Sequence, residues 1–277
     1  MGFKRGRRQC FLDGDLPAKP TPFTQRAPIS AETLDLIARP GVVRVALRPR
    51  GRTRLVGPAD LCGADLYDLE EITRPTTWRA QKNFTGKVAI AHPRGDFQGW
   101  YWSDLEYDHY LELAWEGYEE FNTQFMRIYW HWPDGTVEFH DVDAGFVRDG
   151  QLTLVDISAR AYLTPEKRRL FTLTSLTALV HGLEYEVGTE GGLPEVRRAN
   201  LAFIEMASEH ASVERITGAP ETFTGLVNAY GGGRTGRTRA LRALWQRDFF
   251  IDMNTELRPS SWLSSRPRSP RRAWRTR

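Results

Sequence analysis

The sequence predicts a mixed α/β protein whose core is organised around residues 104–158. Three observations predict this fold class. An amphipathic helical pattern at 104–116 is followed by strand-like segments at 124–132, 136–147 and 151–157. A second helical pattern at 164–180 precedes another strand-like run at 183–187. The order helix, strands, helix, strand is typical of a mixed sheet covered by helices.

The region before this core predicts an arm and a hairpin. Residues 1–40 are basic and proline-rich, and we interpret them as a flexible arm with a short helix at 34–38. Two strand-like runs, 42–47 and 53–56, flank Arg48-Pro-Arg-Gly-Arg52, which predicts a β-hairpin inside an N-terminal region at 41–85. Arginines at such a tip are solvated or contact phosphates. A short acidic helix at 65–72 and a strand at 87–91 complete this part.

Local signals set the bounds of the core elements. Ser103 is a plausible N-cap for the helix at 104–116. Pro133-Asp134-Gly135 and Asp149-Gly150 are tight turns, and segment 143–147 either continues the strand before it or forms the next one. Thr164 with Pro165 opens the helix that runs to about residue 180.

The C-terminal region at 201–257 predicts a helical, winged-helix-like module. Helices are expected at 195–210 and 239–247, and a strand-like run follows at 248–253. Between them, 231–238 resembles a phosphate-binding loop, but Arg237 stands where lysine is required, so we interpret it as a flexible basic linker. Residues 258–277 are arginine-rich and predict a disordered tail.

Composition favours a protein with an anionic partner. The chain has 277 residues, 40% of them apolar and 26% charged, with a net charge of +3. The basic residues are clustered near both ends and around the predicted hairpin, which favours nucleic acid, although solvated tails would give the same pattern. Two cysteines are too few for a disulfide framework, which favours a reducing, cytoplasmic location. No apolar run approaches the ~18 residues of a membrane span, and the N-terminus lacks the apolar segment of a secretory signal.

Three carboxylates are the strongest candidates for chemistry. Glu106 lies on the amphipathic helix, Asp143 precedes Phe146, and Asp156 ends an apolar strand. Separately, Glu106 suits a helix first turn and Asp143 suits a turn cap. Asp156 is harder to explain, since a buried carboxylate needs a partner. Together the three acids could hold a hard divalent cation.

Other site types have weaker support in the sequence. His140 stands near Asp141 and Asp143, which permits a carboxylate–imidazole metal site, although a lone histidine at a strand end is more often packed or solvated. We find no zinc-protease spacing of histidines, no nucleophile elbow and no glycine-rich dinucleotide loop.

Several motifs together resemble the TnsA-like endonuclease subunits of heteromeric transposases. These are the polar-aromatic run 78–84, Gly99-Trp-Tyr-Trp102, Ser103-Asp-Leu-Glu106-Tyr-Asp108, His140-Asp-Val-Asp143-Ala-Gly-Phe146-Val147 and Leu154-Val-Asp156-Ile-Ser158. The resemblance covers roughly residues 42–257 and rests on the order and spacing of these motifs.

This resemblance implies a restriction-endonuclease-like mixed-sheet core of the PD-(D/E)xK type at 86–200. It implies that Glu106, Asp143 and Asp156 bind Mg²⁺ or Mn²⁺. In the family a lysine, or sometimes an arginine, two residues after the last acid orients the attacking water. Here that position is Ser158. Arg160 lies two residues further and would replace it if the strand continues.

The function that the resemblance implies is hydrolysis of phosphodiester bonds at transposon ends. The implied partners are DNA, a DDE-type transposase that cuts the other strand, and an AAA+ regulator, with no membrane. Two alternatives stay open: a catalytically degenerate subunit that serves DNA binding and assembly of the transposase–DNA complex, and an unrelated soluble α/β protein.

Overall fold

The computed structural model describes residues 9–10, 26–74, 86–90, 97–208, 213–214, 216, 218 and 220–264. The polar-aromatic run 78–84, most of the N-terminal arm, and the tail from 265 onward lie outside the described residues. The chain divides into two compact units. The first comprises residues up to Tyr107 together with Tyr118–Thr189, and the second comprises Asp108–Gly117 together with residues from Glu190 onward. The expected division between residues 200 and 201 therefore falls inside a helix of the second unit.

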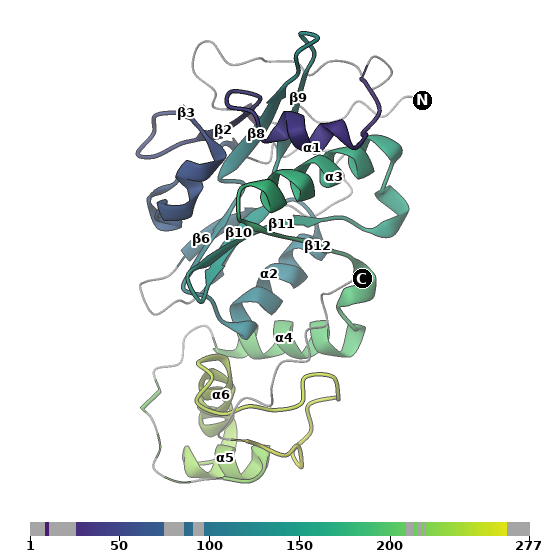
Figure 1. The fold of residues 1–277 in the computed structure, drawn as a ribbon. Coiled ribbons are helices and arrows are strands. Elements are labelled where there is room, and N and C mark those ends of the chain that lie inside the picture. The colour runs from purple at the N-terminus through teal and green to yellow at the C-terminus, as the bar shows by residue number, and fades with distance from the viewer. Residues whose placement is uncertain are drawn as a thin grey trace. The chain divides into compact units, whose positions relative to one another are not determined.

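The first unit contains an antiparallel sheet in the order β3-β2-β8-β9 (Figure 1). Its strands are β2 (Val43–Leu47), β3 (Arg54–Val56), β8 (Met126–His131) and β9 (Val137–Asp141). The predicted hairpin is confirmed, because β2 pairs with β3 in antiparallel register. Its turn uses positive φ angles at Arg50 (49°) and Gly51 (78°).

A second sheet of the same unit has the order β12-β11-β10-β7. Its strands are β7 (Glu120–Thr123), β10 (Ala144–Arg148), β11 (Gln151–Ile157) and β12 (Glu184–Gly188). The β11–β12 pair is parallel, and helix α3 (Pro165–Val180) makes the crossover between these strands. Positive φ angles at Asp149 (52°) and Gly150 (71°) form the tight turn from β10 to β11. The predicted mixed α/β class is confirmed at this level.

The two sheets are connected at a bend that positions Asp143. Strand β9 ends at Asp141, and β10 starts in the other sheet at Ala144. On the neighbouring segment Gln124 has a φ of 51°, and its backbone N–H donates to the carbonyl of Asp143 at 2.9 Å. Such a local break bends a strand pair. Segment 143–147 is therefore the next strand and not a continuation of β9.

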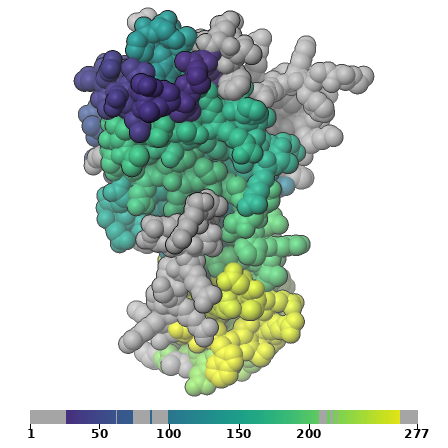
Figure 2. Space-filling view, turned by 45° about the vertical axis from the view of Figure 1, so that its right-hand side comes forward, coloured from purple at the N-terminus to yellow at the C-terminus, as the bar shows by residue number. Residues whose placement is uncertain are grey.

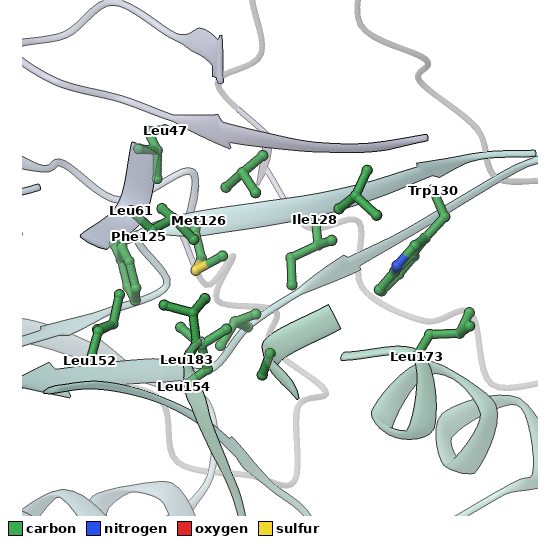
Figure 3. Packing of buried hydrophobic residues seen from close by; sticks show 14 of the residues in the cluster. Leu47, Leu61, Phe125, Met126, Ile128, Trp130, Leu152, Leu154, Leu173 and Leu183 are labelled. Atoms are coloured by element: carbon green, nitrogen blue, oxygen red, sulfur yellow. The ribbon is translucent and has the colours of Figure 1, made fainter. Parts of the chain in front are cut away.

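Apolar side chains from both sheets pack against α3 in one core (Figure 3). Leu154 of β11, Ile128 of β8 and Leu173 of α3 are all buried there. Trp130 packs in the same cluster and donates from its indole N–H to the Thr177 hydroxyl at 3.0 Å. The short helix α1 (Glu32–Ile37) lies against α3, as the purple and green surfaces show in Figure 2.

Short elements complete the first unit. Strands β5 (Gly86–Ile90) and β6 (Phe97–Tyr101) form a hairpin that leads into helix α2 (Asp104–Glu116), whose predicted bounds are confirmed. Strand β1 (Gln9–Cys10) pairs with β4 (Thr73–Arg74). The predicted helix at 65–72 is wrong, because only 3₁₀ turns form, at Pro58–Gly63 and Leu66–Asp68. Asn122 holds the second turn by donating to the carbonyls of Leu66 (2.6 Å) and Leu69 (2.8 Å).

The second unit is helical. It comprises residues 108–117 of α2 with α4 (Glu195–Ser208), α5 (Phe223–Ala229) and α6 (Gly233–Trp245). Trp115 packs near Trp245 with ring centroids 6.4 Å apart. The Arg197 guanidinium donates to the buried Glu112 carboxylate at 2.7 Å. These contacts tie the end of α2 to α4 and α6.

Helices α5 and α6 form a tight helix–turn–helix pair. Gly231, Gly232 and Gly233 have φ values of 93°, 69° and 60° in the turn. A Cβ atom on Gly236 would come within 2.5 Å of the Val227 carbonyl, so the close helix crossing requires glycine there. The flexible-linker interpretation of 231–238 is therefore wrong, because α6 starts inside that segment. The strand at 248–253 is wrong too: in the described part of that segment the pairing is one isolated bridge between Phe250 and Ser264.

Across the residues that the structure describes, no helix combines the length and the apolar character needed to span a bilayer.

Candidate functional site

Asp156 is a fully buried carboxylate near the end of β11. Strands β10 and β12 pair with β11 on either side, so this strand lies inside the sheet. The Asp156 Oδ1 atom lies 2.8 Å from His140 Nε2, and Oδ2 accepts a hydrogen bond of 2.7 Å from the Tyr185 hydroxyl. A buried carboxylate without such partners would cost several kcal/mol. The contacts explain how β11 tolerates the acid.

Asp143 lies beside Asp156 at the bend between the sheets. Because Ala144 pairs with Val155 in antiparallel register, the next opposite pair is Asp143 and Asp156. The backbone N–H of Asp143 donates to Asp156 Oδ1 at 3.4 Å. Asp143 Oδ2 in turn accepts from the backbone N–H of Ile157 at 2.7 Å. The structure thus brings together two of the three predicted acids.

The Asp156 carboxylate shifts the pKa of both side chains that contact it. Burial opposes the charged form of the His140 ring, but the carboxylate of Asp156, followed by those of Asp143 and Asp141, outweighs it and raises the pKa of His140. Burial and the Asp156 carboxylate raise the pKa of the Tyr185 hydroxyl well above its ordinary value, so this hydroxyl stays protonated. His140 was considered at the sequence level as a metal ligand, whereas here it contacts a carboxylate.

Glu106 occupies the first turn of α2, where it is buried. Its carboxylate accepts from the Trp102 backbone N–H at 2.9 Å and from the Ser103 hydroxyl at 3.3 Å. The Ser103 hydroxyl also accepts from the Glu106 backbone N–H at 3.2 Å. This reciprocal arrangement is a capping interaction that stabilises the start of α2. The predicted cap at Ser103 agrees with these contacts.

The three predicted acids do not form a ready-made metal centre. Among the described residues, no three or more His, Cys, Asp or Glu side chains converge closely enough to hold a metal ion. The Asp143–Asp156 pair alone is nevertheless a donor set that suits Mg²⁺, which proteins usually bind through one or two carboxylates plus phosphates and water.

Ser158 and Arg160 follow Asp156 in different environments. Ser158 is buried and extends the pairing of β11, because its backbone N–H donates to the Gly188 carbonyl at 2.9 Å. Arg160 is exposed and starts a 3₁₀ turn at Arg160–Tyr162. The expectation that the strand carries Arg160 on the face of Asp156 is wrong, because β11 ends at Ile157.

A lysine that the sequence analysis did not identify contacts Ser158 in the structure. Lys167, on the first turn of α3, donates from Nζ to the Ser158 hydroxyl at 3.0 Å. The signal in the sequence was indirect, namely the predicted cap at Thr164, which fixes where α3 begins. The Thr164 hydroxyl accepts from the Lys167 backbone N–H at 3.2 Å.

Exposed arginines gather on the β2–β3 hairpin of the first unit and on α6 of the second. In the β2–β3 hairpin, Arg44, Arg50, Arg52 and Arg54 are exposed, and Arg50 lies 3.6 Å from the Asp68 carboxylate. On α6 the exposed arginines are Arg234, Arg237 and Arg239, whereas Leu241 and Leu244 face the interior. Exposed arginines on a helix with an apolar opposite face suit a polyanion.

No protein-family model and no curated protein matches this chain.

Proposed function

We propose that this chain is a metal-dependent DNA endonuclease subunit of a TnsA-like heteromeric transposase. The observation that carries the proposal is the Asp143–Asp156 pair: Asp156 is on a central strand of a mixed sheet, and Asp143 is opposite it and donates its backbone N–H to the Asp156 carboxylate. Such a pair at a strand end is a common way to hold the cation of a nuclease site. The proposal also draws on the motif resemblance over residues 42–257.

In this proposal Asp143 and Asp156 hold Mg²⁺ or Mn²⁺, and Glu106 is the third acid by motif. When bound, the metal lowers the pKa of a water molecule and neutralises charge on the scissile phosphate. The Tyr185 hydroxyl keeps Asp156 oriented through its 2.7 Å hydrogen bond. Ser158 and Arg160 flank the acids, and exposed Arg160 is suited to contact a phosphate rather than the buried carboxylates.

DNA contacts are assigned to the basic surfaces. The pair α5–α6 has the tight glycine turn of a helix–turn–helix, and the arginines Arg234 and Arg237 lie in the first half of the second helix. On this basis we propose that residues 201–257 form a helical, winged-helix-like module with α5 and α6 as its helix–turn–helix. A DDE-type transposase and an AAA+ regulator are the proposed partners, because the resembled family works with both.

A second candidate is a degenerate nuclease-fold subunit that binds DNA and supports assembly. The observation that favours it is the set of hydrogen bonds that already occupies both oxygens of Asp156. The serine at position 158, where the resembled family has a lysine, also favours the degenerate subunit.

One experiment separates the two candidates. The chain is incubated with transposon-end DNA, the partner transposase and Mg²⁺ or Mn²⁺, and strand cutting is followed on gels. The nuclease proposal expects that Asp143→Asn and Asp156→Asn each slow cutting at least about 100-fold, since metal stabilisation of the transition state contributes several kcal/mol. The matched control is Asp149→Asn, which alters an exposed acid on the β10–β11 turn. No cutting with either metal, together with DNA binding that survives Asp143→Ala, would establish the degenerate subunit.

A further inference from the structure

The Nζ atom of Lys167 lies next to the side chain of Ser158. Ser158 follows Asp156 by two residues and continues the pairing of β11 with β12, so alternation along a strand directs both side chains to one face of the sheet. Ser158 is 4% exposed, and its hydroxyl accepts from Lys167 Nζ at 3.0 Å. A cation from α3 therefore meets the same strand end that carries the acid.

The position of Lys167 is set by the packing of α3. Thr164 caps the helix, Pro165 stands at its first position, and the bond from Trp130 to Thr177 fixes it to the sheet. The lysine itself is an exposed residue whose ammonium end turns toward a buried serine. The side chain of Lys167 therefore reaches from the surface of α3 to the end of β11.

The next two residues of α3 are also cations, but their partners differ. Arg168 donates from Nε to the Leu163 carbonyl at 3.1 Å. Arg169 binds the buried Glu138 carboxylate at 2.6 and 2.8 Å, so its charge is neutralised inside the protein. In the described part of the chain, the Lys167 ammonium contacts a neutral hydroxyl and forms no ion pair. Arg168 also contacts a neutral group, so what distinguishes Lys167 is that its cation reaches the strand end that follows Asp156.

We propose that Lys167 supplies, from α3, the ammonium that position 158 lacks beside the Asp143–Asp156 pair. This inference rests on the proposed nuclease function and assigns a catalytic residue to it. Lys167 exchanges the Ser158 hydroxyl for a non-bridging oxygen of the scissile phosphate and stabilises the negative charge that grows there. Lysine suits this relocation because its ammonium is a point charge on a flexible stem, so a helix and a strand can deliver it to one place.

The test compares Lys167→Met with the double variant Lys167→Met/Ser158→Lys, which moves the ammonium back to the strand. Arg168→Met is the matched control, since it removes an exposed cation from the neighbouring position. We expect Lys167→Met to slow cutting about 100-fold, as the loss of one charge-stabilising donor does in other enzymes. The double variant should cut at least about tenfold faster than Lys167→Met. The cutting rate of Arg168→Met should stay within about threefold of that of the unaltered chain.

DNA binding gives a readout that does not depend on cutting. With Ca²⁺ in place of Mg²⁺, the slope of log affinity against log salt should fall by about 0.9 in Lys167→Met, as expected for one lost phosphate contact. A lysine that only ties α3 to β11 would leave this slope unchanged and would lower the unfolding midpoint instead.

The two hypotheses fail in different ways. If Lys167→Met cuts like the unaltered chain while Asp156→Asn does not cut, the role of Lys167 is refuted and the nuclease proposal stands. If the unaltered chain cuts with neither metal and the salt slope of Lys167→Met is unchanged, both proposals are refuted. Recovery in the double variant would support the relocated ammonium.

Discussion

Two fully buried carboxylates of the first unit, Glu138 and Asp156, are held in opposite ways. Glu138 accepts from Arg169 at 2.6 Å, lies 3.2 Å from Arg26, and accepts from the Trp132 indole at 2.8 Å. Asp156 instead contacts one imidazole, one phenolic hydroxyl and the backbone N–H of Asp143. Within the residues described, arginine neutralises the first acid and no arginine contacts the second. A carboxylate that no guanidinium neutralises is suited to bind a cation, whereas one held by two arginines is suited to structure.

The largest effect on stability is expected at Glu138. Glu138→Ala leaves the guanidinium groups of Arg26 and Arg169 without their shared carboxylate. Breaking a buried pair in this way costs about 3–5 kcal/mol. The free energy of unfolding, measured by urea titration, should fall by that amount. Asp35→Ala, at an exposed position of α1 in the same unit, is the control and should stay within about 0.5 kcal/mol. An equally small loss at Glu138 would remove the contrast between the two acids.

The parts of the fold that depend on local signals could be predicted from the sequence. The start of β11 follows from the Asp149-Gly150 turn, and the start of α3 follows from Thr164 and Pro165. The helix expected at 65–72 failed for a long-range reason. Its apolar spacing also fits 3₁₀ turns, and these are held by the Asn122 amide, more than 50 residues away in the chain.

The sequence likewise predicted some residues of the candidate site and missed others. The residue pattern marked Asp143 and Asp156 separately, and the register of β10 against β11 places them together. Lys167 was beyond sequence reasoning, because its approach to Ser158 depends on how α3 crosses from β11 to β12. Arg160 was misplaced because the end of a strand, where the chain turns into a 3₁₀ helix, has no strong local signal here.

A smaller effect is expected from removing one of the two arginines at Glu138. Arg169→Met eliminates two charge-assisted hydrogen bonds but leaves Arg26 and the Trp132 indole in contact with the carboxylate. We expect a loss of about 3 kcal/mol, near the upper end for hydrogen bonds to a charged group. The urea midpoint of Arg168→Met, which removes the neighbouring exposed arginine, should change little. If both variants lose the same free energy of unfolding, the Arg169–Glu138 pair contributes no more to stability than an exposed arginine does.

The next effect concerns the weaker partners of Asp156. Tyr185→Phe removes the hydroxyl that donates to Oδ2 and leaves that oxygen without this bond. The expected loss is about 1–2 kcal/mol, the usual cost of unpairing a buried polar atom. Tyr162→Phe, at a tyrosine that is 69% exposed, serves as the control. A loss as large as that of Glu138→Ala would show that Asp156 is held as firmly as the structural acid.

The smallest effect on stability is expected at Asp156 itself. Asp156→Asn keeps the shape of the side chain and an oxygen that can accept from Tyr185, while it removes a buried charge whose desolvation opposes folding. The change in unfolding free energy should stay below about 1 kcal/mol, although the same substitution is expected to abolish cutting. Thermal and urea unfolding check the first statement, and the cutting assay checks the second. A loss of several kcal/mol would place Asp156 with Glu138 as a structural acid, and the activity loss would then report misfolding rather than a missing ligand for the cation.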